Sequence, residues 1–334
     1  MTRAADLGVA VIGTGFGARV VAPAFAATEA VAVIAVVSAR DDAAVAAAIS
    51  DSRVALVSVH SPPFLHERHV RMALEAGRSV LCDKPFTPSA ETSRRLVADA
   101  ADSPGVHLVN FEFRFHPLRE RTRELVAAGA LGTVEHVVWT HLSAGSRRPL
   151  RPYGWLFDRE RGGGWIGAWA SHAVDTLRFT FGEVEAVNTS VPRLAVLHRP
   201  DRRGEMHACT AEDGLSALLT LRSGPTVTID SSFAASAPLP PRLTIVGSDA
   251  TLENVGDERL VLRDGSGRRE DVTGGAREAA ADHHAAPMGA LAVVARDAVR
   301  RGEAPAALAT FADGLACDEV LEQLRAAPIA VSGM

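Results

Sequence analysis

The sequence carries 35 lysines and arginines, and only one of them, Lys84, is a lysine. Since solvated cations are nearly interchangeable, a coding bias toward arginine would replace any lysine that supplies only surface charge. An ammonium is a compact donor whose pKa burial can lower, whereas a guanidinium is bulky and effectively never deprotonates. Lys84 is therefore a candidate catalytic residue, and the alternative is a chance survivor of the bias. Pro85 follows it and restricts the local backbone.

A glycine motif, Gly13-Thr14-Gly15-Phe16-Gly17-Ala18, follows the first apolar run and opens a helical stretch. In this context GxGxxG/A is typical of a dinucleotide-binding turn. Gly13 permits the tight turn, Gly15 lets the backbone approach a pyrophosphate, and Ala18 lets the helix pack on the strand. The free N–H groups of the helix N-terminus would then face the phosphates. The motif predicts a nicotinamide dinucleotide, and an ordinary glycine turn is the alternative.

The second apolar run ends at Ser38-Ala39-Arg40, where an NAD-selective site usually places an acidic residue against the ribose 2′-hydroxyl. Ser38 and Arg40 instead suit a 2′-phosphate. We therefore expect NADP to be preferred, with NAD as the alternative cofactor. Asp41 and Asp42 come next and are expected in the first turn of a helix, where carboxylates favour the helix dipole.

A second glycine-rich segment runs from Gly162 to Asp175 and contains His172. Glycines let the backbone pass close to a ligand, and His172 and Asp175 at positions i and i+3 share one helical face. A histidine can move a proton near neutral pH, and a neighbouring carboxylate can hold its tautomer. A structural histidine on an amphipathic helix is the alternative interpretation.

Short apolar runs alternate with helical stretches in the first third of the chain, which predicts a parallel sheet with helices on both faces. The predicted strands are 7–12, 31–37, 55–59, 79–82 and 106–111, and the predicted helices are 18–27, 42–49, 65–76 and 89–101, with Ser89 as the N-cap of the last. Lys84 would follow the fourth strand, and the carboxyl ends of such strands border a cofactor crevice.

The pattern changes after Pro117, where strand-like runs separated by Gly, Pro and Asp predict a large, open, mostly antiparallel sheet. The predicted strands are 134–142, 206–210, 215–221, 226–231, 243–247 and 260–263, and the predicted helices are 118–128, 170–181, 288–300 and 311–324. Residues 238–241 and 264–275 are expected to be surface loops. We expect a Rossmann domain over 1–117 and an α+β domain over 118–334 for substrate binding and oligomerisation, with the last helices packing back on the first domain.

The chain has 334 residues, 47% of them hydrophobic and 22% charged, as expected for a globular protein of two domains. A net charge of −5, with no basic cluster interleaved with aromatics, argues against nucleic acid as a partner. The apolar run 31–37 is too short to span a bilayer. With no recognisable leader and with three cysteines that lack CxxC spacing, we expect a cytoplasmic protein with reduced thiols and no metal.

Taken together, the glycine turn, Asp83-Lys84-Pro85 and the His172 segment resemble the glucose-fructose oxidoreductase/inositol dehydrogenase/MocA family. Further segments of the chain are similar to the family: 61–66, 73–77, 114–117 and 155–158. The resemblance implies hydride transfer between a nicotinamide and a sugar, polyol or related carbonyl, in a homo-oligomer such as a dimer or tetramer. It also implies that Lys84 and His172 are catalytic.

The same resemblance suggests two further sets of site residues. Ser61, His66 and Pro85, with Lys84, would lie at the cofactor, and Arg114, Tyr153, Trp165, Trp169 and Asp175 would lie at the substrate. Arg114, Tyr153 and the two tryptophans could equally serve packing.

Two departures from the family pattern affect these expectations. Many sugar and polyol dehydrogenases of the family have an aspartate four residues before the histidine, and this chain has Ala168. Catalysis would then rest on Lys84 and His172, or recruit another acid such as Tyr153, the only tyrosine. The segment between Arg40 and Ala55 is also shorter than in relatives, which trims the adenine side of the pocket.

We therefore expect an NADP-preferring oxidoreductase acting on an alcohol or ketone, with Lys84 polarising the substrate oxygen and His172 exchanging the proton. Reduction of an imine or a conjugated double bond is one alternative, because it needs less proton abstraction and tolerates Ala168 better. A catalytically weak cofactor-binding protein with a structural or regulatory role is the other. Retention of the lone lysine argues against that role, and loss of the aspartate argues for it.

Overall fold

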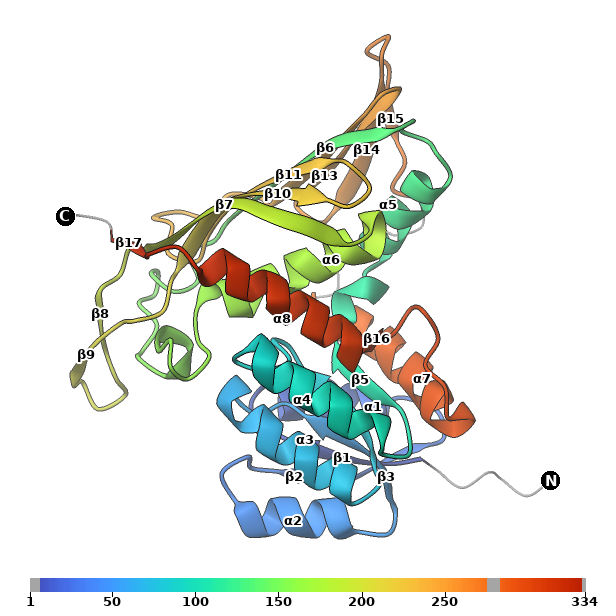
Figure 1. Ribbon diagram of the computed structural model, residues 1–334, viewed down its shortest axis with the longest axis vertical. Helices are drawn as coiled ribbons and strands as arrows, with labels where there is room; N and C mark the ends of the chain where they lie inside the picture. Colours follow the sequence, from blue (N-terminus) through green and yellow to red (C-terminus); the bar gives the residue numbers. More distant parts are fainter. Residues whose placement is uncertain (1–6, 275–282, 332–334) are drawn as a thin grey trace. The chain divides into compact units, whose positions relative to one another are not determined.

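In the computed structural model, which describes residues 7–274 and 283–331, the backbone forms two units (Figure 1). Of these residues, the first unit contains 7–116 and 283–319. The second contains 117–274 and 320–331. Helix α8 thus begins in the first unit and ends in the second.

The first unit contains a parallel sheet in the order β16-β5-β4-β3-β1-β2, with β16 antiparallel at its edge. Its strands are β1 (Leu7–Ile12), β2 (Val31–Val37), β3 (Val54–Val59), β4 (Ser79–Asp83), β5 (His107–Asn110) and β16 (Ala309–Thr310). Its helices are α1 (Ala22–Ala26), α2 (Asp42–Ser50), α3 (His66–Glu75), α4 (Ala90–Ala101), α7 (Ala285–Arg301) and the start of α8 (Phe311–Arg325). The predicted Rossmann arrangement is confirmed.

Burial and capping explain these elements. All of β1 is buried, as expected for a strand covered on both faces. Ser89 accepts a hydrogen bond from the N–H of Thr92, so the predicted N-cap of α4 is confirmed. Asp41 caps α2 in the same way through the N–H of Ala44. Helix α7 joins the core of the first unit, where Leu291 and Ala295 pack in one apolar cluster with strand residues such as Val9.

The second unit contains a sheet in the order β15-β14-β13-β12-β6-β11-β10-β7-β17, in which only the β6–β11 and β7–β17 pairs are parallel among the described strands. The strands are β6 (Val134–Leu142), β7 (Val184–Leu194), β10 (Gly214–Leu221), β11 (Thr226–Ser232), β12 (Arg242–Gly247), β13 (Ala250–Val255), β14 (Arg259–Asp264), β15 (Arg269–Asp271) and β17 (Ala330–Val331). A separate hairpin pairs β8 (His198–Pro200) with β9 (Met206–Ala208). Helices α5 (Pro117–Ala127) and α6 (Ser171–Phe181) lie along the sheet (Figure 1). The expected open, mostly antiparallel sheet is confirmed.

Four strands of this sheet, β7, β13, β15 and the two-residue β17, were not predicted from the sequence. Strands β7 and β13 mix polar and half-exposed residues, so neither presents a clear apolar run, and Pro192 interrupts β7. Strand β15 lies inside the stretch 264–275 that was expected to be a loop, and that expectation was wrong for Arg269–Asp271. All three β15 residues are exposed and the strand lies at the sheet edge, where hydrogen bonding to β14 rather than burial maintains it.

Candidate active site

The first glycine motif follows β1, at the carboxyl edge of the parallel sheet. Gly13 has a φ of +135°, and a Cβ there would overlap the carbonyl oxygen of His60. A Cβ on Gly17 would come within 3.0 Å of both His60 Cβ and Val11 Cγ1, so the backbone at Gly17 also lies close to neighbouring protein atoms. A Cβ on Gly15 would meet nothing within 4 Å. The fold therefore explains Gly13 and Gly17, whereas the space beside Gly15 is open and fits a phosphate group lying against the backbone.

The end of β2 presents one cation and one hydroxyl. The Ser38 hydroxyl oxygen accepts a hydrogen bond from the N–H of Arg40 at 3.3 Å. Asp41 is used as the α2 cap, and Asp42 pairs with Arg68 at 2.8 Å. Arg40 is exposed, and among the described residues its guanidinium has no ion-pair partner. An exposed guanidinium without an ion-pair partner among the described residues suits an anionic ligand group.

Lys84 directly follows β4 and is half-buried. The preceding residue, Asp83, holds this turn: its Oδ1 accepts hydrogen bonds from the Lys84 N–H at 3.1 Å and from Asn110 Nδ2 at 3.2 Å, and its Oδ2 lies 3.4 Å from His60 Nδ1. Burial opposes the charged form of Asp83, but the hydrogen bond with His60 and the charges of His60 and Lys84 outweigh it and lower the carboxyl pKa to about 2. The carboxylate is therefore ionised at neutral pH beside the lone lysine.

The loop after Lys84 is anchored from α8. Thr87 donates its N–H to Asp318 Oδ2 at 3.0 Å, and the Ser93 hydroxyl donates to the same oxygen at 2.6 Å. The Phe86 ring packs on Phe311 with centroids 4.4 Å apart. Asp318 and its partners hold the Lys84 loop from residues more than 200 positions later in the sequence, and no sequence pattern pointed to them.

Ser61 and His66 lie next to the same loop. The His66 ring is fully buried, and its two nitrogens face the carbonyl oxygens of Phe86 and Ser61. The Ser61 hydroxyl lies 3.1 Å from His69 Nδ1. The structure thus brings Ser61 and His66 together with the turn that carries Lys84 and Pro85.

Arg114 lies in the first unit, in the short helical turn Glu112–Phe115 that follows β5. Its side chain is buried, and its guanidinium pairs with Asp313 Oδ1 at 3.2 Å. Because this ion pair joins the end of the sheet to the start of α8, Arg114 has a clear structural function. Its expected contact with substrate stays a prediction.

In the second unit, His172 and Asp175 lie on α6 and both are buried. Ala168 lies in a π-helical segment, Ile166–Ala170, which directly precedes α6. A π-helical turn takes in one more residue than an α-helical turn. The side chain at position 168 is therefore not placed relative to His172 as simple i, i+4 helix geometry would place it.

The second glycine segment is packed by the protein itself. A Cβ on Gly163 would overlap the carbonyl oxygen of Trp155, and a Cβ on Gly164, whose φ is +104°, would overlap Glu212 Oε1. Glu212 is buried, accepts the Ile166 N–H at 3.1 Å and lies 3.3 Å from Arg325 Nε. These two glycines were expected to make room for a ligand, and the structure shows that they make room for a carboxylate and a carbonyl of the same unit.

The two tryptophans of this segment belong to an aromatic cluster against the sheet. Trp165 stacks on Phe233 with centroids 4.3 Å apart and donates its indole N–H to Ser231 Oγ at 2.7 Å. Trp169 meets Trp139 edge-to-face at 5.6 Å. Both contribute strongly to packing. A role in substrate binding is an additional expectation for them.

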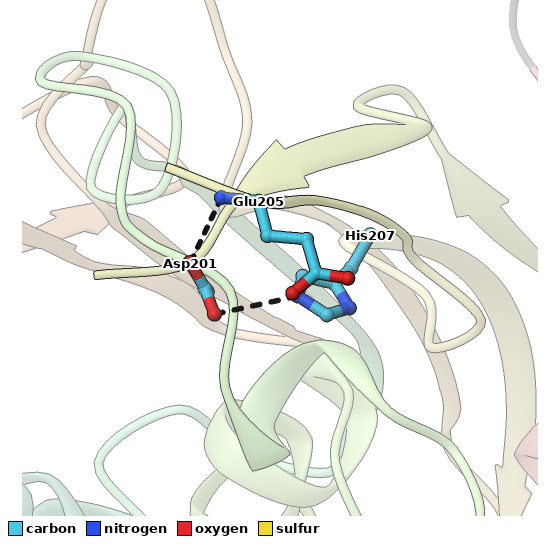
Figure 2. Close-up of side chains that lie close together, drawn as sticks. All are labelled: Asp201, Glu205 and His207. Carbon is cyan, nitrogen blue, oxygen red and sulfur yellow. Dashed lines mark hydrogen bonds and ion pairs between the residues drawn. The ribbon is translucent and has the colours of Figure 1, made fainter. Parts of the chain in front are cut away.

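Tyr153 lies against the β8–β9 hairpin, where its ring stacks on His207 with centroids 4.7 Å apart. Burial, followed by the nearby charge of Asp158, raises the pKa of Tyr153, so the phenol stays protonated at neutral pH. Figure 2 shows the neighbouring Asp201, Glu205 and His207, whose ligand-type atoms lie within 4.8 Å of one another. Asp201 Oδ1 already accepts the N–H groups of Arg203 and Glu205 and so closes the hairpin turn, which explains the grouping without an ion.

Comparison with known proteins places the chain in a family. A model described as an oxidoreductase family with an NAD-binding Rossmann fold, GFO_IDH_MocA, matches residues 7–111, and the GFO/IDH/MocA C-terminal domain matches residues 120–253. The protein belongs to the glucose-fructose oxidoreductase/inositol dehydrogenase/MocA family, as the sequence motifs predicted. Along residues 7–274 and 283–331, each helix is too short or too polar to cross a membrane.

Two curated relatives show the range of similarity. An uncharacterized oxidoreductase of Synechocystis sp. is 33% identical over 66% of this chain and 64% of its own length. Levoglucosan dehydrogenase of Pseudarthrobacter phenanthrenivorans is 30% identical over 52% of this chain and 42% of its own length. The chain therefore spans between about two-fifths and two-thirds of the length of these relatives.

Among solved structures, a levoglucosan dehydrogenase in complex with NADH has a TM-score of 0.82 at 21% identity, covering 96% of each chain. A super-repressor mutant of Gal80p from Saccharomyces cerevisiae has a TM-score of 0.80 at 15% identity, covering 96% of this chain and 95% of that one. These similarities establish the shared fold.

Proposed function

We propose that the protein is an NADP-preferring oxidoreductase that interconverts an alcohol and a carbonyl on a sugar-like or polyol substrate. The observation that carries this proposal is the carboxyl edge of the parallel sheet, where the open space at Gly15, the unpaired Arg40 and the lone lysine, Lys84, follow strands of one sheet. Family membership supports it, since relatives include a levoglucosan dehydrogenase and an inositol 2-dehydrogenase.

The cofactor preference rests on Ser38 and Arg40. We propose that Arg40 binds the 2′-phosphate of NADP, because it is exposed while both following aspartates already have structural partners. Thr14, Phe16 and the motif glycines would contact the pyrophosphate. Both cofactors occur among relatives: a D-xylose 1-dehydrogenase (NADP+) of Haloferax volcanii is 31% identical over 55% of this chain, and the levoglucosan dehydrogenase was solved with NADH.

The proposed chemistry assigns one task to each catalytic side chain. When bound, the nicotinamide supplies or accepts the hydride at the substrate carbon. The Lys84 ammonium donates a hydrogen bond to the substrate oxygen and stabilises the negative charge that develops there during reduction. His172 gives that oxygen its proton in reduction and removes it in oxidation. Arg114, Tyr153, Trp165, Trp169 and Asp175 are proposed to bind and orient the substrate.

The alanine at position 168 leaves a second reaction class as an alternative. Without the carboxylate that many relatives have beside the histidine, reduction of an imine or a conjugated double bond is the alternative, because it demands less proton abstraction. Loss of that carboxylate also keeps a catalytically weak, cofactor-binding protein with a structural or regulatory role as a third outcome. A panel of sugars, polyols, imines and enones with NADPH and NADH separates the three possibilities.

The decisive variants are Lys84→Arg and Lys84→Met. Loss of a positioned donor costs about two to four orders of magnitude in rate, and arginine should be nearly as damaging as methionine because it changes the size, geometry and proton exchange of the group. NADPH affinity should change much less, since the glycine turn holds the pyrophosphate. The measurements are turnover and NADPH affinity, with folding checked by thermal melting. Normal turnover of Lys84→Arg on an established substrate would remove Lys84 from catalysis.

Assembly and location complete the proposal. We propose a cytoplasmic homo-oligomer, a dimer or a tetramer, with the small-molecule substrate as its partner. Light scattering coupled to size-exclusion chromatography measures the assembly directly, and a monomer at micromolar concentration would contradict it.

A further inference from the structure

An arginine-rich loop follows strand β6 in the second unit. Residues 143–153 contain Arg147, Arg148 and Arg151, and the last two of these side chains are exposed. Among the described residues, the guanidinium groups of Arg148 and Arg151 form no ion pair and donate no side-chain hydrogen bond. Each therefore keeps its five N–H donors for another acceptor. The loop offers positive charge that no carboxylate of the described chain pairs with.

A buried arginine, Arg199, holds the backbone of this loop. Its guanidinium donates hydrogen bonds to the carbonyl oxygens of Ser146 and Arg151, the second at 3.2 Å, and to Ser146 Oγ at 3.0 Å. The same guanidinium lies over the Phe157 ring, 4.0 Å from its centroid. Burying a cation is costly unless such contacts replace its water. The backbone that carries Arg151 is therefore fixed by a side chain of the core.

The loop is also joined to the end of β11. Ser143 donates its N–H to the Ser232 carbonyl oxygen at 2.7 Å, and Ser146 donates its N–H to the Phe233 carbonyl oxygen at 3.0 Å. The Arg151 guanidinium lies over the Phe233 ring, 5.2 Å from its centroid. The attraction between a cation and an aromatic ring needs no hydrogen-bond acceptor. Arg151 is thus held at Phe233 while its N–H donors stay available.

Phe233 connects Arg151 to residues that we propose at the substrate. The Phe233 ring stacks on Trp165 with centroids 4.3 Å apart, and Trp165 in turn stacks on Trp169 at 6.0 Å. Both tryptophans belong to the glycine-rich segment that leads into α6 and His172. Arg151 therefore contacts the same aromatic cluster as the proposed substrate residues of this unit.

A carboxylate close to the loop already binds other groups. The backbone carbonyl of Asp213 accepts the Phe233 N–H at 2.8 Å, which places Asp213 beside this region. The Asp213 side chain is buried, and its two oxygens accept the N–H groups of Ala195 and Val196 at 2.9 and 3.0 Å. Within the described part of the chain it forms no ion pair with Arg151. An anion from outside the protein is the ligand that matches the available donors.

We propose that the substrate carries an anionic group, a carboxylate or a phosphate ester, and that Arg151 binds this group. The inference rests on the proposed function, since it assigns a substrate class, sugar acids or sugar phosphates, to the same site. A guanidinium presents paired N–H donors that match both anions, and such charge-assisted hydrogen bonds are about twice as strong as neutral ones. Arg147 and Arg148 add positive charge that attracts the anion from solution.

The substrate class is tested by binding, without any turnover. In the full-length protein with its tighter-binding cofactor, calorimetric titration compares D-glucose with D-glucuronate and D-glucose 6-phosphate, and myo-inositol with myo-inositol 1-phosphate. We expect an anionic probe to bind about tenfold or more tightly than its neutral partner, and its affinity to fall as salt rises. Tighter binding of the glucuronate identifies a carboxylate, and tighter binding of the phosphates identifies a phosphate ester. If no anionic probe binds more tightly than its neutral partner, the proposal is overturned.

The role of Arg151 is tested with Arg151→Met. Methionine keeps an unbranched apolar side chain against Phe233 and removes the charge and the N–H donors. The anionic probe should lose about tenfold to a hundredfold in affinity, whereas the affinities of its neutral partner and of NADPH should change less than about threefold. Arg151→Lys, which keeps the charge without the paired donors, should lose about threefold to tenfold. Thermal melting checks the folding of both variants.

Arg148→Met is the matched control. It removes an exposed arginine of the same loop that lies over no aromatic ring of the described chain, and it should lower the affinity of the anionic probe less than about threefold. Equal losses in Arg148→Met and Arg151→Met would show a general charge effect and overturn the assignment to Arg151. An equal loss of NADPH affinity in Arg151→Met would show that the guanidinium serves the cofactor, which overturns it as well.

Kinetics separates this inference from the proposed function. On an anionic substrate, Arg151→Met should raise KM about tenfold or more and keep kcat within about threefold, whereas Lys84→Met should lower kcat. If neutral sugars and polyols are turned over as well as their anionic partners, the inference fails and the proposed function stands. If an anionic probe binds through Arg151 and no probe is oxidised or reduced, the anion site stands and the proposed function fails.

Discussion

The two glycine-rich segments of this protein look alike in sequence and differ in what surrounds them. In the turn after β1, Gly15 faces open space, and a side chain there would touch no protein atom within 4 Å. In the segment before α6, the positions that side chains would take at Gly163 and Gly164 are occupied by the Trp155 carbonyl and the Glu212 carboxylate. One segment leaves room for a ligand, and the other makes room for its own fold.

The comparison shows that a glycine run can have either of two structural causes, and the sequence alone does not distinguish them. A close approach by a ligand and a close approach by the protein both exclude Cβ. Only the identity of the neighbouring atoms distinguishes the two cases. Substitutions at the two segments should therefore affect different quantities, the free energy of unfolding in one case and cofactor affinity in the other.

The largest expected effect on stability is that of Gly164→Ala. A φ of +104° strains any L-residue, and the new methyl would displace Glu212 from the Ile166 N–H and from Arg325. Strain and overpacking each cost about 1–3 kcal/mol, so we expect a loss of about 2–5 kcal/mol in the free energy of unfolding, measured by denaturant titration. In a Glu212→Ala background the cost should fall to that of backbone strain alone. An equal cost in both backgrounds would show that Glu212 is not what occupies this space.

Gly15→Ala should lower cofactor affinity and leave the free energy of unfolding nearly unchanged. Its side-chain position is open and its φ is not in the left-handed region, so the unfolding free energy should change by less than about 1 kcal/mol. NADPH affinity should fall by about tenfold to a hundredfold, because a methyl group in a close backbone approach costs about 1–3 kcal/mol. Gly265→Ala is the matched control: this exposed glycine also has open space and ordinary φ, and its substitution should change neither quantity. Unchanged NADPH binding in Gly15→Ala would contradict the assignment of the first segment.

Arg40→Ala tests whether the first segment and the end of β2 bind NADPH in preference to NADH. We expect NADPH affinity to fall about tenfold and NADH affinity to stay the same, because an exposed charge-assisted hydrogen bond to the 2′-phosphate is lost. Titration of intrinsic tryptophan fluorescence with both cofactors measures this. Arg301→Ala, which removes an exposed arginine at the end of α7, is the control for a general charge effect. A parent protein that prefers NADH would defeat the NADP assignment.

The smallest expected effect is that of Ala168→Asp, at the end of the second glycine segment. The variant restores the carboxylate that many relatives have, and a nearby negative charge stabilises protonated histidine. We expect the pH profile of turnover to shift upward on its His172 limb, whereas Ala168→Asn, of the same size without the charge, should leave it in place. Identical profiles for parent and Ala168→Asp would show that position 168 does not face the reacting groups.

Local sequence patterns predicted most of the strands and helices of the first unit. The apolar runs that became β1 and β2 had the observed bounds, and the N-cap at Ser89 follows from one side chain and its nearest N–H groups. These features depend on residues close together in the chain. In the second unit, β7 and β13 escaped prediction because half-exposed strands are maintained by their partners across the sheet, which a single run of residues does not contain.

The sequence by itself determined the family, the dinucleotide turn and the unusual status of Lys84, because each rests on residue types at short spacing. Only the tertiary structure decided which atoms surround those residues. It placed Asp318 under the Lys84 loop, Glu212 against Gly164, and the Ser61 and Phe86 carbonyls on the two sides of His66. The physical reason is that burial and hydrogen bonding act between groups that packing brings together. These groups are from five to more than 200 residues apart in the chain, so their spacing in the sequence does not predict that they are in contact.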